Sequence, residues 1–443
     1  MRINLLEKIK RNDVLKSISI LVSGNIIGRF IALVTMPIVS RLYSPEEFGE
    51  NGVIVATAAI IVNLGGLGLN SAVMAPNNDK ESNIVFKVAF FTSSFIYIVL
   101  FFLSLVFSSW YQLAHTTLPY LITCSMIFLV AFSSQLNSLL NVYINRKGMN
   151  RVLFYNAIIS SLSTLFITIP LGFLRFGVLG LIGAALVSGL LCALQMIYHA
   201  NPFREKIIWS DFKTVFKKYK NFILYQYPSN FIGSFATQYP TRFFSANYGN
   251  EKLGNYNMNE RILGIPLHFL AAPITIIYFR TASQQQDQRD ELARFTYRLI
   301  KNIMLVAIIP IVVLALWGEK LFGFALGNQW SAAGKLASVL VIQYVYDFCS
   351  SSISYCRVAL NRQKLNLWVV IIRLILAVAS LYIGMYIFED LFAVIVLFSI
   401  SMTVFFVIDM ALNFYALQRY MVKYLIFSVV YALLAFLLVF LVG

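Results

Sequence analysis

Long apolar runs dominate this chain and restrict the folds open to it. A run of about 20 apolar residues is long enough to cross the hydrocarbon core of a bilayer as a helix. A helix also satisfies its own backbone in lipid, and the alternating pattern of a β-barrel is absent, so each run is predicted to be helical. The runs lie at residues 16–42, 46–75, 83–109, 117–143, 151–173, 177–200, 221–246, 253–280, 299–326, 333–358, 365–388, 391–416 and 422–442. We expect the first twelve to cross the membrane; the last either crosses it or lies along it.

The composition supports an integral membrane protein. Of the 443 residues, 59% are hydrophobic and 12% are charged, about half the charged share of an average soluble domain. The net charge of +16 is not gathered in a basic arm or a soluble domain, so nucleic acid is excluded as a partner. The four cysteines lie in apolar runs without metal-ligand spacing, which predicts buried free thiols and no metal site.

The positions of Lys and Arg predict the orientation. If the N-terminus is cytoplasmic, 26 of the 35 basic residues lie in the N-terminal arm and the cytoplasmic loops, and six lie in the opposite loops. Loops on the cytoplasmic side carry an excess of Lys and Arg. The sequence therefore predicts a multi-pass protein with its N-terminus in the cytoplasm.

The two halves of the chain resemble each other. At a shift of 205 residues, "NIIGRFIALVTMPIVSRLYSPEEFGEN" (25–51) matches "NFIGSFATQYPTRFFSANYGNEKLGNY" at eight of 27 positions, and Gly49/Gly254 is one of the matched pairs. At a shift of 216, Asn145, Arg146 and Asn150 match Asn361, Arg362 and Asn366. Repeats with an even number of spans pack about an axis along the membrane normal, with a cavity between two lobes, which is typical of transporters.

The predicted organisation follows this repeat. An N-lobe of six spans with an amphipathic N-terminus covers residues 1–200, a polar, basic cytoplasmic connector covers 201–220, and a C-lobe of six spans covers 221–417. Residues 418–443 form a further predicted span. The predicted fold class is an all-α membrane protein with two six-helix lobes related by a pseudo-two-fold axis.

Several motifs resemble a known family. The N-lobe opening, "LGNYNMNERILGIP" (253–266), "LGNQWSAAG" (326–334), "NRKGMN" and "NRQKLN" are together similar to the polysaccharide-exporter branch of the multidrug/oligosaccharidyl-lipid/polysaccharide (MOP) flippase superfamily. The resemblance covers most of residues 15–420. It implies a protein of the bacterial cytoplasmic membrane that moves an undecaprenyl-diphosphate-linked oligosaccharide, such as an O-antigen or capsule unit, to the outer leaflet. It also implies polysaccharide polymerase and chain-length proteins as candidate partners.

Polar stripes on the first helix of each lobe indicate a cavity lining. One stripe consists of Asn25, Arg29, Ala32, Met36 and Ser40, and its repeat counterpart consists of Asn230, Ser234, Thr237, Thr241 and Ser245. Residues at this spacing share a helix face. Interhelical hydrogen bonding by single hydroxyls is the simpler alternative, but two stripes at symmetric positions favour a cavity.

Charged residues within the spans are the candidate substrate and coupling residues. A charge at mid-membrane costs about 2.5–3.5 kcal/mol on insertion scales and normally faces a partner or a wet cavity. An arginine fork matches phosphate oxygens bidentately, and related flippases line their cavity with cations, so the resemblance implies that Arg29 and Arg261 contact the diphosphate. Two further substrate-binding candidates are His268, on one face with Glu260, and Arg373, which could instead reach the cytoplasmic surface.

The intramembrane acids Glu260, Asp347 and Asp409 are candidates for proton or sodium coupling, or for charge balance of an arginine. No other cofactor is expected. A Walker A loop is absent, and no catalytic motif is found, so the protein is not predicted to be an enzyme. Three alternatives stay open: a multidrug cation antiporter of the same superfamily, a lipid II flippase, and more remotely a membrane polysaccharide polymerase.

Overall fold

The computed structural model describes residues 23–106, 116–203, 208–266, 270–285, 288–360, 365–388 and 390–442. Within these ranges the regular structure is helical, and no strand occurs. After a first helix at Ser23–Leu42, the elements of the first half are α2 (Pro45–Gly66), α3 (Leu69–Ala72), α4 (Asp79–Val106), α5 (Tyr120–Arg146), α6 (Asn150–Phe173), α7 (Val178–Ala200) and α8 (Trp209–Lys218). Those of the second half are a π turn (Phe222–Gln226), α9 (Tyr227–Tyr248), α10 (Asn250–Pro266), α11 (Ala272–Gln284), α12 (Arg289–Leu326), a 3₁₀ turn (Asn328–Trp330), α13 (Ser331–Ser352), α14 (Cys356–Ala359), α15 (Leu365–Ile387), α16 (Leu391–Leu417) and α17 (Met421–Val442).

Ten of the described helices are long and apolar enough to cross a membrane: Ser23–Leu42, α2, α4, α5, α6, α7, α12, α15, α16 and α17. Three predicted runs are interrupted. The run 46–75 divides into α2 and α3 at Leu67 and Gly68, whose φ angles of 46° and 71° are left-handed. The runs 253–280 and 333–358 divide into α10 with α11 and α13 with α14. Helices α9, α10 and α13 are not among these ten, and each carries candidate site residues: Thr237 on α9, Glu260 on α10 and Asp347 on α13.

The four cysteines are unpaired and buried, as expected. The chain forms two compact units. One consists of the described residues up to Tyr43 together with Glu50–Ser234, and the other of Ser44–Gly49 together with Phe235–Gly443. The division between them falls within α9, beyond the connector that the sequence places at 201–220. Each unit repeats one packing scheme: α6 lies on α7, α5 on α7 and α4 on α5, as α15 lies on α16, α13 on α16 and α12 on α13. This shared scheme is the structural counterpart of the sequence repeat.

A capping box starts α2. The backbone N–H of Ser44 donates to the Glu47 carboxylate at 2.8 Å, and the Glu47 N–H donates to Ser44 Oγ at 3.2 Å. Pro45 follows as the first helical residue, a position where its missing N–H costs nothing. The sequence Ser-Pro-Glu-Glu therefore fixes where this helix begins.

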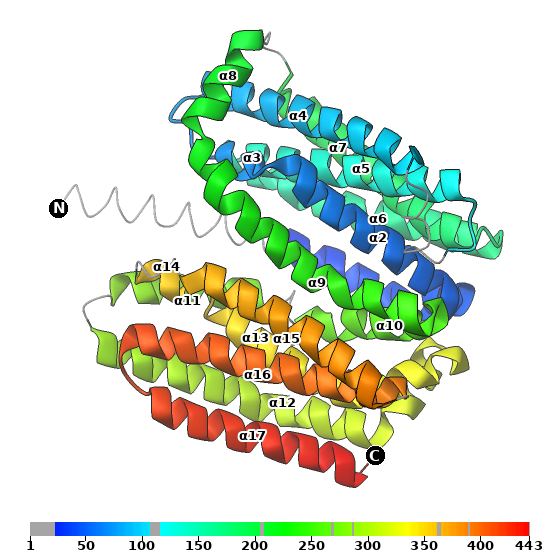
Figure 1. Ribbon diagram of the computed structural model, residues 1–443, viewed down its shortest axis with the longest axis vertical. Coiled ribbons are helices and arrows are strands. Elements are labelled where there is room, and N and C mark those ends of the chain that lie inside the picture. Colours follow the sequence, from blue (N-terminus) through cyan, green and yellow to red (C-terminus); the bar gives the residue numbers. More distant parts are fainter. Residues whose placement is uncertain are drawn as a thin grey trace. The chain divides into compact units, whose positions relative to one another are not determined.

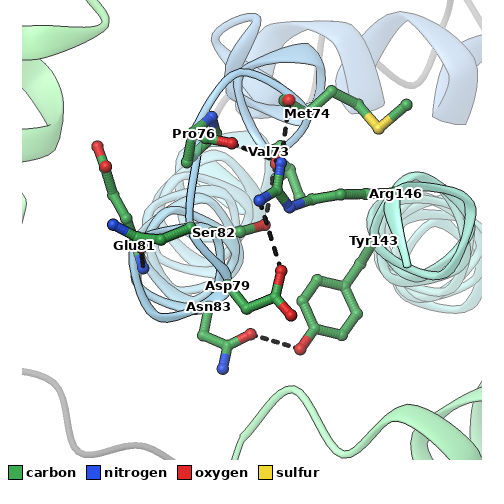
Figure 2. Close-up of polar contacts among 10 residues, drawn as sticks. Val73, Met74, Pro76, Asp79, Glu81, Ser82, Asn83, Tyr143 and Arg146 are labelled. Atoms are coloured by element: carbon green, nitrogen blue, oxygen red, sulfur yellow. Dashed lines mark hydrogen bonds and ion pairs between the residues drawn. The ribbon is translucent and has the colours of Figure 1, made fainter. Parts of the chain in front are cut away.

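Arg146 joins the end of α5 to the turn before α4 (Figure 2). Its Nη1 donates to the carbonyls of Met74 and Pro76 at 3.2 and 2.6 Å, and its Nη2 lies 3.5 Å from Asp79 Oδ1. Nearby, Tyr143 donates to Asn83 Oδ1. The planar guanidinium can reach two carbonyls of one turn, so it holds that turn against α5.

The predicted connector contains the amphipathic helix α8, which packs on α4. Val215 is buried, and Phe212 and Phe216 pack against the same apolar cluster. Glu81 accepts hydrogen bonds from Lys218 and, at 2.7 Å, from the Tyr219 hydroxyl. Burial and this bond to Glu81 raise the pKa of Tyr219 above its ordinary value, so the hydroxyl stays a donor at neutral pH. The part of the connector at residues 209–219 is thus anchored to α4.

Helix α17 packs within the second unit against α12, α13 and α16 (Figure 1). The Tyr431 hydroxyl donates to the Met304 carbonyl at 2.7 Å, and Tyr297 of α12 contacts Tyr420 and Phe427. Helices α12 and α17 therefore run side by side in the same direction. Because α17 is also long and apolar enough to span, its packing favours a crossing helix over one that lies along the surface.

Two glycines allow backbone-to-backbone approach in the second unit. A Cβ on Gly49 would lie 1.9 Å from the Asn250 carbonyl oxygen, and one on Gly254 would lie 1.7 Å from that of Pro45. These two glycines are a matched pair of the sequence repeat, and any side chain would force the segments apart.

Candidate functional site

A polar cavity of about 330 Å³ lies inside the second unit. Glu260 comes from α10, Asp347 from α13 and Arg373 from α15, and all three line it. Thr237 of α9 lines the same cavity. The structure thus brings together four of the residues predicted from sequence, from four different helices.

The charges in this cavity partly compensate one another. Two carboxylates share the space with one guanidinium, a combination that lowers the cost of charge within a membrane. Asp347 Oδ1 also accepts a hydrogen bond from Ser351 at 3.1 Å, and the Arg373 guanidinium lies 5.9 Å from the centre of the Phe405 ring. The cavity thus contains two carboxylates, groups able to take up a proton, together with one fixed positive charge.

Asp409 lies elsewhere, in a buried ion pair. Its Oδ1 is 2.6 Å from Arg357 Nη1, and its other oxygen accepts a hydrogen bond from Ser350. Arg357 Nε donates to Asn366 at 2.8 Å, so the pair joins α14, α16 and α15. Asn413 donates to the backbone carbonyl of Asp409 rather than to its carboxylate. This geometry gives Asp409 the charge-balancing contact that was one of its two expected roles.

Arg261 lies beside an aromatic ring. Its side chain is exposed, and the guanidinium lies 4.8 Å from the centre of the Phe48 ring, also in the second unit. Phe48 in turn meets Trp330 edge to face, with ring centroids 5.1 Å apart. An aromatic face stabilises a cation without consuming its hydrogen-bond donors, so the Arg261 fork stays available to an anion.

Arg29 is exposed on the first helix, in the first unit. That helix packs on α6 through Gly24 and Gly28, which meet Phe154 and Ala157 respectively. Within the described residues, the Arg29 guanidinium makes no hydrogen bond or ion pair. One turn earlier, Asn25 lines a second polar cavity, of about 620 Å³, formed with α5, α6 and α7.

The stripe on α9 is divided by the structure. Asn230 is exposed and accepts a hydrogen bond from Gln226 at 2.9 Å, whereas Ser234 donates to the Ala59 carbonyl at 3.4 Å. Thr237 reaches the cavity, but Thr241 is buried. Hydrogen bonding within the helix bundle, the simpler expectation, therefore accounts for part of the stripe. His268 lies outside the described residues.

Sequence reasoning missed residues in both cavities. Tyr256 and Tyr344 line the cavity of the second unit. In the first unit, asparagines of α5 and α6 line the larger cavity, and their four-residue spacing was the signal that could have found them. Among the described residues, no group of three or more His, Cys, Asp or Glu side chains could hold a metal ion.

Comparison with known proteins places these features in a family. Residues 38–335 match the family described as "Polysaccharide biosynthesis protein". The chain belongs to this family. It is similar to the succinoglycan biosynthesis transport protein ExoT of Rhizobium meliloti (strain 1021), with 22% identity over 80% of this chain and 71% of ExoT. An uncharacterized membrane protein in the cps region of Klebsiella pneumoniae is 19% identical over 83% of this chain and 74% of its own length.

Solved structures show the same fold. The lipid II flippase MurJ in an inward closed conformation matches with a TM-score of 0.71 and 13% identity, over 95% of this chain and 96% of MurJ. An inward-facing MATE family multidrug transporter of the MOP superfamily matches with a TM-score of 0.66 and 16% identity, over 90% of this chain and 98% of the transporter. These matches confirm the predicted all-α transporter fold and the resemblance to the polysaccharide-exporter branch.

Proposed function

We propose that this protein carries an undecaprenyl-diphosphate-linked oligosaccharide from the cytoplasmic to the outer leaflet of the bacterial inner membrane by alternating access. One observation carries the proposal: Arg29 presents an exposed guanidinium within an apolar span, with no protein partner among the described residues. An unpaired cation in a span is costly, and an anionic headgroup offsets that cost. The polysaccharide family and the ExoT relative support a carbohydrate-linked substrate.

Arg29 and Arg261 are the proposed contacts for the diphosphate. Both side chains are exposed, and the Phe48 ring beside Arg261 leaves its donors available. A multidrug cation antiporter needs acids where these arginines stand, so the two cations favour the anionic substrate. Lipid II also carries a diphosphate, and the polysaccharide family disfavours it.

Glu260 and Asp347 are the proposed coupling residues, for a proton or sodium ion. They share one cavity with Arg373, which balances their charge. We therefore propose charge balance, rather than contact with the substrate, as the role of Arg373. Asp409 is assigned to charge balance because Arg357 and Ser350 already occupy its carboxylate.

A deletion strain complemented with variants tests the proposal. Without the protein, full-length lipid-linked repeat units should accumulate on the inner leaflet, and wild-type protein should clear them. Arg29→Ala should restore little surface polysaccharide, while Arg29→Lys restores part of it because a point charge replaces the fork. Ile38→Ala, an exposed change on the same helix, is the matched control. If Arg29→Ala and Arg29→Lys both restore wild-type levels at normal expression, Arg29 does not hold the headgroup.

A further inference from the structure

The larger cavity of the first unit has an uncharged, amide-rich lining. On α5, Asn137, Asn141 and Asn145 line it at four-residue intervals, so they form one row about 12 Å long. On α6, Asn156, Ser160 and Thr164 line it at the same intervals. None of its lining residues carries a formal charge, which distinguishes it from the cavity of the second unit.

Small side chains of α7 contribute to the lining of this cavity. Ala185, Ser188 and Gly189 line it. A Cβ on Gly189 would lie 2.4 Å from Ser133 Oγ and 3.4 Å from Asn137 Nδ2. Small residues here let α5 approach α7. The volume of about 620 Å³ falls within the usual range of about 300–1,000 Å³ for small-molecule sites.

Asn156 offers an unpaired hydrogen-bond acceptor to this cavity. Its side chain is 9% exposed and lines the cavity, yet its Oδ1 has no hydrogen-bond partner among the described residues. Buried polar atoms are nearly always paired, by protein, water or ligand. Asn137 differs, because its Nδ2 donates to the Gly189 and Ser133 carbonyls at 3.0 and 2.8 Å and so also joins helices. The Asn156 acceptor has no such structural task.

We propose that this cavity binds neutral sugar rings of the transported oligosaccharide, a subsite that rests on the proposed function. A side-chain amide offers both a donor and an acceptor, which matches a sugar hydroxyl that is itself both. The absence of charge on the lining disfavours a diphosphate. Asn25 lies one helical turn from Arg29, about 6 Å along the axis, so a sugar in the cavity would leave its diphosphate within reach of the arginine.

Binding to the full-length protein in lipid nanodiscs tests the subsite directly. The probes are methyl glycosides of glucose, galactose and N-acetylglucosamine, observed by saturation-transfer NMR, with inorganic pyrophosphate as competitor. At least one glycoside should bind to the wild type without displacement by pyrophosphate. Asn156→Leu and Asn141→Leu should each weaken binding about threefold to tenfold, the range expected for one lost hydrogen bond. Asn63→Leu, which removes only a bond to the Ala59 carbonyl of its own helix, should bind like the wild type.

A stability measurement separates binding from packing. Since Asn156 Oδ1 is unpaired, Asn156→Leu should leave the thermal unfolding temperature unchanged or raise it. A lower unfolding temperature with unchanged glycoside affinity would make Asn156 a packing residue and overturn the subsite. So would the absence of binding by every glycoside, or displacement by pyrophosphate. Asn141 is exposed, so Asn141→Leu keeps the test valid even if Asn156→Leu folds poorly.

The two proposals fail in different ways. One outcome is that the glycosides bind and the variants lower the affinity for them, while lipid-linked oligosaccharide is not translocated in reconstituted vesicles. In that case the subsite is supported and the proposed function is wrong. If the protein translocates lipid-linked oligosaccharide while no glycoside binds, the function stands and the subsite falls.

Discussion

At Asp409 a carboxylate buried among three helices depends on a single arginine. The side chains of Arg357 and Asp409 are 6% and 7% exposed, so removing one leaves the other charged and without its partner. Breaking a buried pair in this way costs about 3–5 kcal/mol. We therefore expect Asp409→Ala to lower the thermal unfolding temperature sharply and to reduce the monodisperse fraction in size-exclusion chromatography.

Asp290→Ala is the matched control for this prediction. Its partner is Arg419, and both side chains are more than 60% exposed, so the pair is worth at most about 1 kcal/mol. Equal losses of stability in Asp409→Ala and Asp290→Ala would contradict a structural role for the buried pair.

At the scale of single residues, sequence reasoning identified which charges lie in spans but not their partners. Glu260 and Arg261 were both identified as charges within one predicted span, and both lie on α10. It could not show that Asp347 joins Glu260 and Arg373 while Asp409 joins Arg357, because those contacts join helices that are distant in sequence. For the same reason the sequence could not predict that Asn156 Oδ1 has no hydrogen-bond partner, because this depends on the neighbouring helices.

Among the elements, α2 and α10 approach each other backbone to backbone near their beginnings. Gly254→Ala should push them apart, because its Cβ would lie 1.7 Å from the Pro45 carbonyl oxygen and backbone cannot rotate away as a side chain can. Overpacking of this kind costs about 1–3 kcal/mol, and we expect a lower unfolding temperature in detergent.

Gly183→Ala tests whether the effect is specific to that contact. Its Cβ would lie 3.9 Å from Leu171 Cδ1, an ordinary contact, and alanine is the better helix former. It should therefore match or exceed the stability of the wild type. A Gly254→Ala protein as stable as Gly183→Ala would show that the glycine approach is dispensable.

The helices themselves could largely be predicted from the sequence, because an apolar run in lipid has few alternatives to a helix. The interruptions could not. The break between α2 and α3 depends on left-handed backbone at Leu67 as well as Gly68, and Leu67 gives no such signal in the sequence. Helix α8 within the connector was also missed, because the segment is rich in charged residues and its apolar face, which packs on α4, is short.

For the whole molecule, α17 adds a helix to the second unit beyond the repeat. Ala435 is 8% exposed on this helix, whereas its neighbour Leu434 is 60% exposed. Ala435→Trp should lower the unfolding temperature because the ring has no space against the neighbouring helices. Leu434→Trp should have little effect because its side chain points outward. The reverse order would mean that α17 does not pack as described.

The orientation of the chain in the membrane gives a second test at this scale. The excess of basic residues predicts that the turn at Lys147–Met149 is cytoplasmic and the turn at Leu174–Gly177 is external. Alkaline phosphatase fused after Gly148 should be inactive, and phosphatase fused after Arg175 should be active. Fluorescent protein fusions at the same points should give the opposite pattern. Active phosphatase after Gly148 would invert the predicted topology.

The repeat is the whole-molecule feature that the sequence predicted best. Matches such as Asn25/Asn230 and Gly49/Gly254 survive because each copy must solve the same packing problem, and the two units share one scheme of helix contacts. The matched residues have nevertheless diverged in use: Asn25 lines a cavity, whereas Asn230 pairs with Gln226. The symmetry of the fold was readable from the sequence, whereas the different contacts of the two matched asparagines were not.

The small side chains of α7 have a consequence for substrate range. Because Ala185 contributes to the cavity lining with a single methyl group, a series Ala185→Val→Leu would reduce the space in the cavity step by step. Bulky or branched sugars would be rejected before compact ones. If the proposed subsite binds sugars, selectivity would be adjustable by steric volume at one position, without altering the charged residues Arg29 and Arg261.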